Sequence, residues 1–511
     1  MMRMTQTRLA PRRIKPLSAL VLATVLAGCS FVPRLERPAA PVAAEWPTGP
    51  AHREGAIAAA ELPWQDFVHD AQLRELIALA LANNRDLRIA IQAIEQARAQ
   101  YDIRRADTLP TLGASASGNR SAPNPYAAIG GPSVASSYSV GIGVSSWELD
   151  FFGRVAALKD IALANYLATE EARKSAQISL IAAVSSTWLQ LKTDTELLAL
   201  AERVLGTREQ SLRLTQLRFD HGASSALDVR LAESLAANAQ ATRAQQQRLR
   251  AQDINLLTLL VGQALPPQLV PPVPATATPA APDSLTQASA AIAPVADLPS
   301  FATVPAGLPS DLLLRRPDIR AAEQQLIGAN ANIGAARANF FPRIALTGNL
   351  GRVSSDLDGL LGSGGRTAWS FGPSVTLPIF DMGRNQANLD AARAARAIAV
   401  SQYEKAVQTA FREVADALAA RTALADQMAA QQAQARAERD RFRLADLRYR
   451  NGIANYLDLL DAQRALFAIE QALAQTQLAQ RANEVQLYKS LGGGWVDATR
   501  GTDTLPARTG S

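Results

Sequence analysis

This chain of 511 residues has very few of the side chains that carry enzyme chemistry. It contains one cysteine and three histidines, and none of His52, His69 and His221 has a companion metal ligand at helical spacing. The stretch Gly492–Gly494 lacks the Lys and the Ser or Thr that complete a phosphate-binding loop, and no Gly-x-Ser-x-Gly nucleophile turn occurs. We therefore expect a protein that is not an enzyme and that has neither a metal nor a cofactor.

Long hydrophobic runs are also absent, apart from a short one at the N-terminus. Leu17–Leu26 is too short to cross a bilayer as a helix, and it follows five basic residues with no acid. Leu26-Ala27-Gly28-Cys29 comes next and matches the bacterial lipobox, in which a signal peptidase cuts before the cysteine. We expect residues 1–28 to be a lipoprotein signal peptide and Cys29 to carry covalent diacylglycerol and an N-acyl chain. The alternative is an ordinary signal peptide with an incidental cysteine.

A surplus of one charge sign is missing once this leader is set aside. The chain has 52 basic and 46 acidic residues, and five of the basic ones lie in the leader, so 47 basic residues remain against 46 acidic ones. A nearly neutral protein gives no electrostatic reason for binding nucleic acid, and we expect no such partner.

The sequence does contain an internal repeat. Segments match at nearly constant offsets of 230 to 232 residues: Trp147–Arg154 with Leu377–Arg384, Arg218–Gly222 with Arg448–Gly452, and Leu109-Pro110 with Phe341-Pro342. A duplication of this length means that the chain is built from two copies of one structural unit. The expected divisions are a lipidated segment 29–62, repeat 1 at 63–262, a Pro- and Ala-rich linker 263–311, repeat 2 at 312–495 and a flexible tail 496–511.

Each repeat begins with a helix and continues with two segments in which apolar and small polar residues alternate. The helices are expected at about 71–106 and 312–338, and the strands near 111–147 and near 343–378. The alternating segments are 112–117, 138–144, 344–350 and 369–377. Alternation with period two is typical of a strand with one face in lipid and one in water, and a soluble hairpin is the alternative.

The segments after these hairpins are too long for a compact globular core. No glycine or proline lies between Gly383 and Gly452. Residues 154–219 contain one glycine, Gly206, and no proline. A helix of about 65 residues is roughly 100 Å long. A coiled-coil seam is indicated by apolar residues at alternating steps of four and three: Tyr403, Val407, Ala410, Val414 and Ala417. Helices resume at 226–261 and 453–491, which predicts two long helical hairpins with tips near 222 and 452.

Four strands are too few to close a membrane barrel, because known barrels start at about eight strands. An open sheet edge in lipid leaves backbone groups without hydrogen bonds. The barrel must therefore be shared between copies of the chain, and the residues alone leave a dimer, a trimer and a tetramer open.

Several motifs together resemble one protein family. They are the lipobox, Trp64-Gln65-Asp66-Phe67 with Leu76 to Asn84, the two segments Trp147–Arg154 and Leu377–Arg384, and the run Leu308-Pro309-Ser310-Asp311-Leu312-Leu313-Leu314-Arg315-Arg316-Pro317-Asp318-Ile319. The chain resembles the outer-membrane factors of tripartite efflux systems, in particular the NodT-type outer-membrane lipoproteins related to TolC and OprM. The resemblance covers nearly all of the chain after the leader, and the Leu308–Ile319 run is its most specific part.

The resemblance implies an α+β membrane protein that assembles as a homotrimer. Each repeat would give a β-hairpin to a shared trimeric 12-stranded β-barrel and a long helical hairpin to a periplasmic α-barrel, with the linker 263–311 in an equatorial region. The protein would be lipid-anchored in the outer membrane and extend into the periplasm. Its partners would be outer-membrane lipid, a periplasmic adaptor (membrane fusion) protein and an inner-membrane transporter.

The resemblance assigns adaptor contact to the tips of the two helical hairpins. A tight turn between antiparallel helices favours a residue that tolerates positive φ, which explains glycine at both tips. The expected contact residues are Arg218, Gly222 and Ser225 at the first tip, and Arg448, Gly452 and Asn455 at the second.

The second tip also carries the residues expected to form a periplasmic gate. Asp458 and Asp461 are three apart and so share one helical face, and in the family acids from three chains form rings that attract cations. Tyr449 matches a tyrosine that, in some relatives, bonds across to a neighbouring helix. An arginine of those relatives is replaced here by Ala454, so closure would depend more on packing by Tyr456 and Leu457. The alternative is that Asp458 and Asp461 are solvated acids on an outer face of the helix.

The resemblance implies the outer-membrane exit channel of a tripartite efflux pump, passively conducting drugs or toxic solutes from the periplasm to the exterior. An inner-membrane partner, expected to be of the RND type, would supply the energy. Two alternatives stay open: the outer-membrane duct of a type I secretion system, and a lipid-anchored coiled-coil scaffold without a pore.

Overall fold

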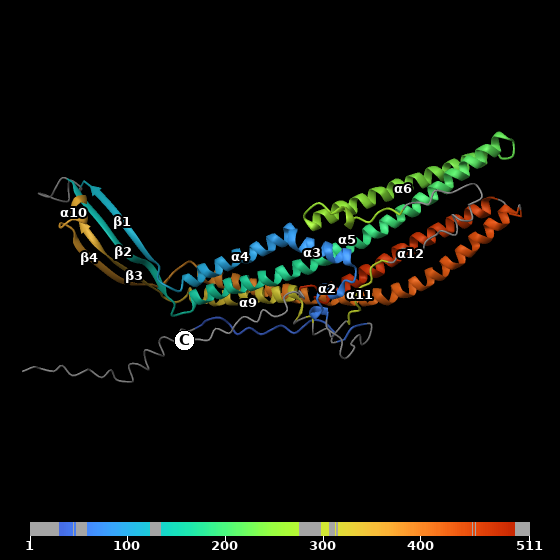
Figure 1. Cartoon of the computed structure of the whole chain (residues 1–511). Coiled ribbons are helices and arrows are strands. Elements are labelled where there is room, and N and C mark those ends of the chain that lie inside the picture. The colour runs from blue at the N-terminus through green and yellow to red at the C-terminus, as the bar shows by residue number, and fades with distance from the viewer. Residues whose placement is uncertain are drawn as a thin grey trace, which may run out of the picture. The chain divides into compact units, whose positions relative to one another are not determined.

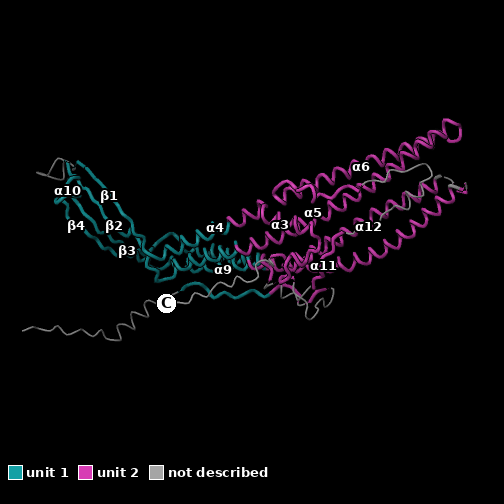
Figure 2. Tube along the Cα trace, viewed as in Figure 1, with its two compact units in different colours: residues 1–39, 93–169, 321–403 teal, residues 40–92, 170–320, 404–511 magenta. Residues whose placement is uncertain are grey.

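The computed structural model describes residues 30–43, 45–47, 59–122, 134–274, 298–305, 312, 315–451, 453–454 and 456–495. The chain forms two compact units, each assembled from three stretches of sequence (Figure 2). Unit 1 comprises residues 1–39, 93–169 and 321–403, and unit 2 comprises residues 40–92, 170–320 and 404–511. Each unit takes residues from both repeats, so the two repeats fold together rather than as separate domains.

The described part of unit 1 contains a four-stranded antiparallel sheet (Figure 1). The strands are β1 (Leu112–Ser121), β2 (Ala135–Leu149), β3 (Arg343–Ser354) and β4 (Arg366–Thr376), and they follow the order β1-β2-β3-β4. The short helix α10 (Leu357–Leu361) lies between β3 and β4 in the chain. The pairing of β1 with β2 and of β3 with β4 confirms one hairpin in each repeat.

Each hairpin is followed by a helix of 67 residues, α5 (Arg154–Asp220) in repeat 1 and α11 (Arg384–Arg450) in repeat 2. Shorter helices come next, α6 (Ala226–Val261) and α12 (Tyr456–Ser490). These four elements confirm the two predicted pairs of long helices. A search of the described residues finds no helix that is both long and apolar enough to span a membrane.

The other described elements are shorter: η1 (Ala59–Glu61), α2 (Trp64–Phe67), α3 (Ala71–Asn83), α4 (Arg85–Ala106), η2 (Pro267–Leu269) and α9 (Pro317–Ala338). The prediction of a single helix at 71–106 is wrong, because the helix is interrupted at Asn84, which separates α3 from α4. The Asn84 side chain accepts a hydrogen bond from the Leu87 N–H (2.9 Å) and donates one to the carbonyl of Leu260 (2.8 Å). An asparagine that caps one helix and binds the end of another favours a break.

The N-terminal segment of unit 1 packs against both repeats. The Phe31 ring lies 4.5 Å from the ring of Phe341 and 6.5 Å from that of Phe152, centroid to centroid. Val32 lies against α9 at Gly334, where a Cβ would come within 2.5 Å of the valine side chain. The residues that directly follow the predicted lipid site are therefore held on the unit that contains the sheet.

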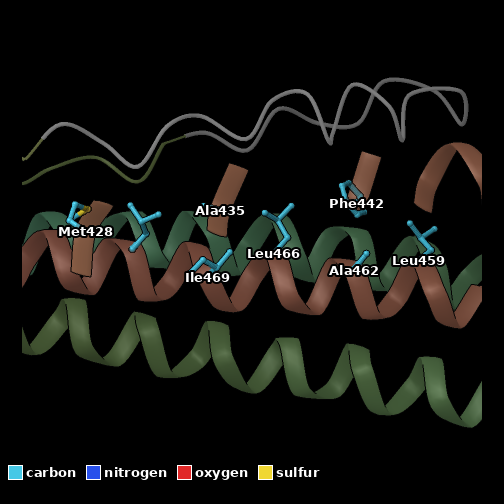
Figure 3. Packing of buried hydrophobic residues seen from close by; sticks show 8 residues of the cluster. Met428, Ala435, Phe442, Leu459, Ala462, Leu466 and Ile469 are labelled. Carbon is cyan, nitrogen blue, oxygen red and sulfur yellow. The ribbon is translucent and has the colours of Figure 1, made fainter. Parts of the chain in front are cut away.

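Unit 2 has a coiled-coil core between α11 and α12 (Figure 3). Its buried residues are Met428, Ala435 and Phe442 of α11 and Leu459, Ala462, Leu466, Ile469 and Leu473 of α12. The α11 residues are seven apart and the α12 residues step by three and four, which is the spacing of interlocking helices. The predicted seam from Tyr403 to Ala417 is also confirmed, since none of its five residues is more than 3% exposed.

A buried arginine joins three helices of unit 2. Arg316 is 7% exposed, and its guanidinium binds the carboxylates of Asp318 (2.6 Å) and Glu413 (2.9 Å). It also donates to the carbonyl oxygen of Ser490 at the end of α12 (2.8 Å). Arg316 and Asp318 belong to the Leu308–Ile319 run, so these polar residues of the run form an internal ion-pair network. A buried charge without such partners would be strongly destabilising.

Candidate functional site

The strand register places the alternating apolar residues on one face of the sheet. Ile142 lies opposite Ala114 of β1 and Leu350 of β3, and Leu350 lies opposite Trp369 of β4. Residues directly opposite each other in a sheet point to the same face. The apolar residues on this face are Leu112, Ala114, Ala116, Tyr138, Val140, Ile142, Val144, Ile344, Leu346, Leu350, Trp369, Phe371 and Val375, and the register also places the polar residues Arg352, Ser354 and Thr367 there. Trp369 is 76% exposed in the single chain, so this apolar face is not a core.

The opposite face carries small and polar residues. The hydroxyl oxygens of Ser117 and Ser139 are 2.7 Å apart across β1 and β2, and the Thr347 hydroxyl donates to the carbonyl of Gly372 (2.9 Å). Glycine is required at 141, because a Cβ there would lie 2.8 Å from a backbone oxygen of β3. The two faces of the sheet therefore differ in polarity, as the alternation predicted.

A bulge in β2 keeps these two faces intact. The register between β2 and β3 shifts between Val144 and Trp147, where β2 has one residue more than its partner. β4 pairs with β3 in one uninterrupted register. The extra residue lets the side chains on both sides of the bulge stay on one face, since a slip of one residue would reverse them.

An aspartate caps the long helix that follows each hairpin. The carboxylate of Asp150 accepts from the backbone N–H of Ala156 (2.7 Å), and that of Asp381 accepts from the N–H of Asn385 (2.8 Å). Gly153 and Gly383 have φ of 71° and 82°, a conformation that favours glycine. The repeated Gly-Arg therefore marks the turn from strand to helix.

The first helical tip is a glycine turn followed by a capped helix. Gly222 has φ of 72°, which confirms the positive φ expected there. Ser225 caps α6: its hydroxyl accepts from the N–H of Asp228 (3.2 Å), and that carboxylate accepts from the N–H of Ser225 (3.0 Å). Hydrogen bonds from Ser225 lower the pKa of Asp228.

The second tip is linked to the first by a hydrogen bond. The Arg218 guanidinium at the end of α5 donates to the Tyr449 hydroxyl near the end of α11 (2.8 Å). Tyr449 is partly buried against the core of α11 and α12, whereas Arg448 is exposed. Gly452 and Asn455 lie outside the described residues, as does the side chain of Tyr456.

Both predicted gate acids, Asp458 and Asp461, are exposed, as is Leu457. Asp461 forms an ion pair with Arg441 of α11, which also binds Glu438 (3.3 Å). Sequence reasoning missed Arg441, although a signal existed: residues 441 and 461 are equally far from residue 451 at the tip, so a tight hairpin brings them together.

A carboxyl pair within unit 2 was also missed. Asp194 of α5 is 3% exposed, and it lies close enough to Asp253 of α6 to influence that carboxyl. Burial raises the pKa of Asp253 to about 7, and the contact with Asp194 acts in the same direction. Neither residue stands in a recognisable motif, because the pair depends on how two helices pack.

Two further predictions concern metals and lipid. Over the part of the chain that the structure describes, no three His, Cys, Asp or Glu residues are grouped so that they could hold a metal ion. Cys29, the predicted lipidation site, lies outside the described residues.

Comparisons with known proteins agree over almost the whole chain. The family described as "Outer membrane efflux protein" matches residues 76–263 and 308–493. The chain is 46% identical over 487 residues to the probable efflux pump outer membrane protein TtgC of Pseudomonas putida, with 94% of this chain and 96% of that protein covered. It is 45% identical over 479 residues to the outer membrane protein OprJ of Pseudomonas aeruginosa, with 94% and 95% covered.

Solved structures give the same result. The open state of the Neisseria gonorrhoeae MtrE outer membrane channel matches with a TM-score of 0.78 and 40% identity, covering 91% of this chain and 99% of that one. A membrane protein from Pseudomonas aeruginosa matches with a TM-score of 0.78 and 43% identity, covering 91% and 100%. Since the family match spans well over half of the residues and the relatives align along nearly their full length, this chain belongs to the outer membrane efflux protein family.

Proposed function

We propose that this chain forms the exit duct through which a tripartite efflux pump passively releases its cargo from the periplasm to the exterior. As a member of the outer membrane efflux protein family, it is an outer-membrane protein that acts in efflux, and the family consists of channel proteins rather than enzymes. The observation that carries the proposal is the two-faced sheet, whose apolar face suits lipid and whose serine- and glycine-rich face suits a water-filled lumen.

The duct requires several copies of the chain. β1 and β4 are the outer strands of the sheet, and an outer strand exposed to lipid leaves backbone groups unpaired. Three copies would supply a 12-stranded barrel, and their helical hairpins would form an α-barrel in the periplasm. Acyl chains on Cys29 would anchor each copy to the membrane that the barrel crosses. A coiled-coil scaffold without a pore has no use for the amphipathic sheet.

The helical tips are the proposed docking surface for a periplasmic adaptor, which would connect the duct to an inner-membrane transporter. Arg218, Gly222 and Ser225 would contribute from the first tip, and Arg448, Gly452 and Asn455 from the second. Exposed apolar side chains support this role, because Leu227 is 78% exposed and Ile453 is 68% exposed. Apolar groups left in water beside a tight turn favour contact with another protein.

The gate is proposed at the same end, at Tyr449, Tyr456, Leu457, Asp458 and Asp461. The bond from Arg218 to Tyr449 supports a latch between the two helical hairpins. Asp461 is paired with Arg441, and a paired carboxylate contributes less negative charge to a lumen than an unpaired one. The pairing therefore supports a smaller contribution of Asp461 to the attraction of cations.

The proposed cargo is small toxic compounds, moved by a transporter of the RND type. Relatives that are 45% to 47% identical are named as toluene, solvent and antibiotic efflux pump proteins. These names favour small molecules over the polypeptides of a type I secretion duct.

Planar-bilayer recording of the purified oligomer tests the duct. We expect a small conductance in the unaltered protein and a larger one for Tyr449→Phe, which removes the hydroxyl that Arg218 binds. Arg443→Gln, an exposed change on the same helix, serves as the control and should leave conductance unchanged. Absence of any conductance, even after replacing Asp458 and Asp461 with alanine, would refute the duct.

A further inference from the structure

We infer that Arg120 and Arg352, at the outer rim of the apolar face of the sheet, bind the phosphate groups of outer-leaflet lipid. Both arginines lie on that face, close to the ends of β1 and β3. The inference rests on the proposed duct, which puts the apolar face against lipid and the far ends of these strands at the cell surface. It goes beyond the duct, because a pore needs no positive charge on its lipid side.

The strand register places both arginines on the apolar face. Arg352 of β3 lies opposite Val140, a member of that face. Arg120 of β1 lies opposite Ser136, which is four residues from Val140 on β2. Residues directly opposite each other share a face, and so do residues four apart on one strand. The apolar face therefore ends in a cation on each of these two strands.

The two arginines also occupy equivalent positions of the internal repeat. Arg120 follows Leu112 by eight residues, and Arg352 follows Ile344 by eight. Leu112 and Ile344 each stand two residues after the proline that ends the preceding helix. The offset between the arginines, 352 − 120 = 232, thus belongs to the repeat. Since each copy of the chain has one arginine per hairpin at this place, a barrel of three copies would carry a ring of six.

The position of the ring along the strands matches the edge of the hydrocarbon layer. Eight residues at about 3.3 Å each, on strands tilted by about 40°, rise roughly 20 Å. The apolar band of an outer-membrane barrel is about 25 Å tall. A lipid-facing arginine strongly destabilises a barrel at the bilayer midplane but costs little near the interface. Arg120 and Arg352 therefore lie where the headgroups of the outer leaflet begin.

The loop between β3 and β4 lies on the same side of the sheet. Nη2 of Arg352 donates to the carbonyl oxygens of Gly362 (2.6 Å) and Gly365 (3.1 Å) in this loop. Its helix α10 contacts β2 and β3 at the end of the sheet (Figure 1). Leu357 and Leu361 of α10 are 63% and 83% exposed. Leucines exposed beside a lipid-facing surface favour contact with acyl chains.

The chemistry of the rim fits a lipid that carries phosphate groups. A guanidinium group has five N–H donors in a planar fork, which binds phosphate by paired, charge-assisted hydrogen bonds. The loop carbonyls engage only Nη2 of Arg352, so its other nitrogens can donate to a phosphate. Asp356 and Asp358 of the same loop are exposed acids, and a divalent cation can bridge such carboxylates to a phosphate. A neutral headgroup would offer the arginines no opposite charge.

Native mass spectrometry of the purified oligomer in detergent tests the site, with EDTA present so that binding does not depend on a divalent cation. The probes are diphosphoryl lipid A, the same lipid with both phosphates removed, and inorganic phosphate as a competitor. Losing one charge-assisted contact weakens binding about ten-fold. We therefore expect Arg120→Gln to raise the Kd for diphosphoryl lipid A about ten-fold and the double variant with Arg352→Gln to raise it further. The dephosphorylated lipid should bind weakly to every variant.

Arg366→Gln is the matched control. Arg366 of β4 is exposed and lies opposite Val353, the neighbour of Arg352 on β3, so it is at the same rim but on the other face of the sheet. Its replacement should leave the Kd unchanged. Because Arg352 also binds its own loop, the exposed Arg120 carries the test if the double variant does not assemble.

Three results would overturn the inference. They are equal binding of diphosphoryl lipid A by the unaltered protein and Arg120→Gln, full competition by inorganic phosphate, and a loss with Arg366→Gln as large as that with Arg120→Gln. Planar-bilayer conductance of the same preparations keeps the site and the duct apart. Conductance without a preference for the phosphorylated lipid would refute the site alone, whereas phosphate-dependent binding without conductance would refute the duct alone.

Discussion

At the first tip, Gly222 sets the turn through its backbone conformation. Gly222 has φ of 72°, and nothing lies within 4 Å of the place where its Cβ would be. A side chain there meets no obstacle, but an L-residue in this conformation costs about 1–2 kcal/mol. The turn is therefore sensitive to substitution although it is open to solvent.

Gly222→Val is expected to abolish efflux while leaving the oligomer and its membrane insertion intact, because the strain is confined to the turn. The measurement is the toxic-compound susceptibility of a deletion strain carrying the variant, with the oligomer followed on native gels. Gly206→Ala is the control: this glycine lies within α5 with free space around it, and alanine favours a helix by about 1 kcal/mol. Full resistance with Gly222→Val would count against adaptor docking at this tip.

Asp253 makes stability depend on pH. Its pKa is about 7 in the folded chain, against about 3.9 in an unfolded one, so the folded state binds the extra proton. The stabilisation is fully present below about pH 4 and is lost as the pH rises through about 7.

Asp253→Asn should remove this pH dependence, because an amide keeps the neutral form at every pH. Thermal unfolding in detergent, followed by circular dichroism at pH 5 and pH 8, should give a larger fall in Tm for the unaltered chain than for the variant. Asp228→Asn, at an exposed cap whose carboxyl pKa is lowered, provides the comparison. An equal fall in Tm for the unaltered chain and Asp253→Asn would show that protonation of Asp253 does not cause the pH dependence.

Among the elements, the sheet offers the sharpest contrast between neighbouring positions. Leu350 and Asn349 are adjacent on β3 and point to opposite faces. Leu350→Lys would place a charge on the lipid side, at a cost of about 2–4 kcal/mol near the bilayer midplane, whereas Asn349→Lys would face water.

We expect Leu350→Lys to lower the yield of assembled oligomer in the outer membrane several-fold and Asn349→Lys to leave it close to normal. Heat-modifiable mobility on gels after membrane fractionation measures both. The reverse order of sensitivity would mean that the apolar face lines the lumen.

For the whole molecule, the expected membrane attachment is double: acyl chains on Cys29 and strands in the bilayer. A single acyl chain binds membranes only weakly, whereas a closed barrel is held by all of its strands. Cys29→Ser should therefore leave much of the protein in the outer-membrane fraction after alkaline washing, provided that the variant is exported. Complete release into the soluble fraction would contradict the shared barrel.

Patterns in the sequence were sufficient for the two-fold repeat, the two-faced strands and the four long helices, which contain no proline and one glycine, Gly206. The repeat is found by matching segments about 230 residues apart. The strands and helices depend on the spacing of residue types along a few turns, as in the seam from Tyr403 to Ala417. The positive φ of Gly222 belongs to the same class, because few other residues tolerate it.

Other features depend on contacts between residues that are far apart in the sequence. The break at Asn84 depends on a carbonyl 176 residues away, and the Arg218 bond to Tyr449 joins two different hairpins. The Asp194–Asp253 pair exists because two helices meet there. The bulge in β2 depends on the register in which β2 pairs with β3. A periodic pattern specifies which face of an element is buried or wet, but not which partner meets that face, since partners are chosen by contacts between residues far apart in the chain.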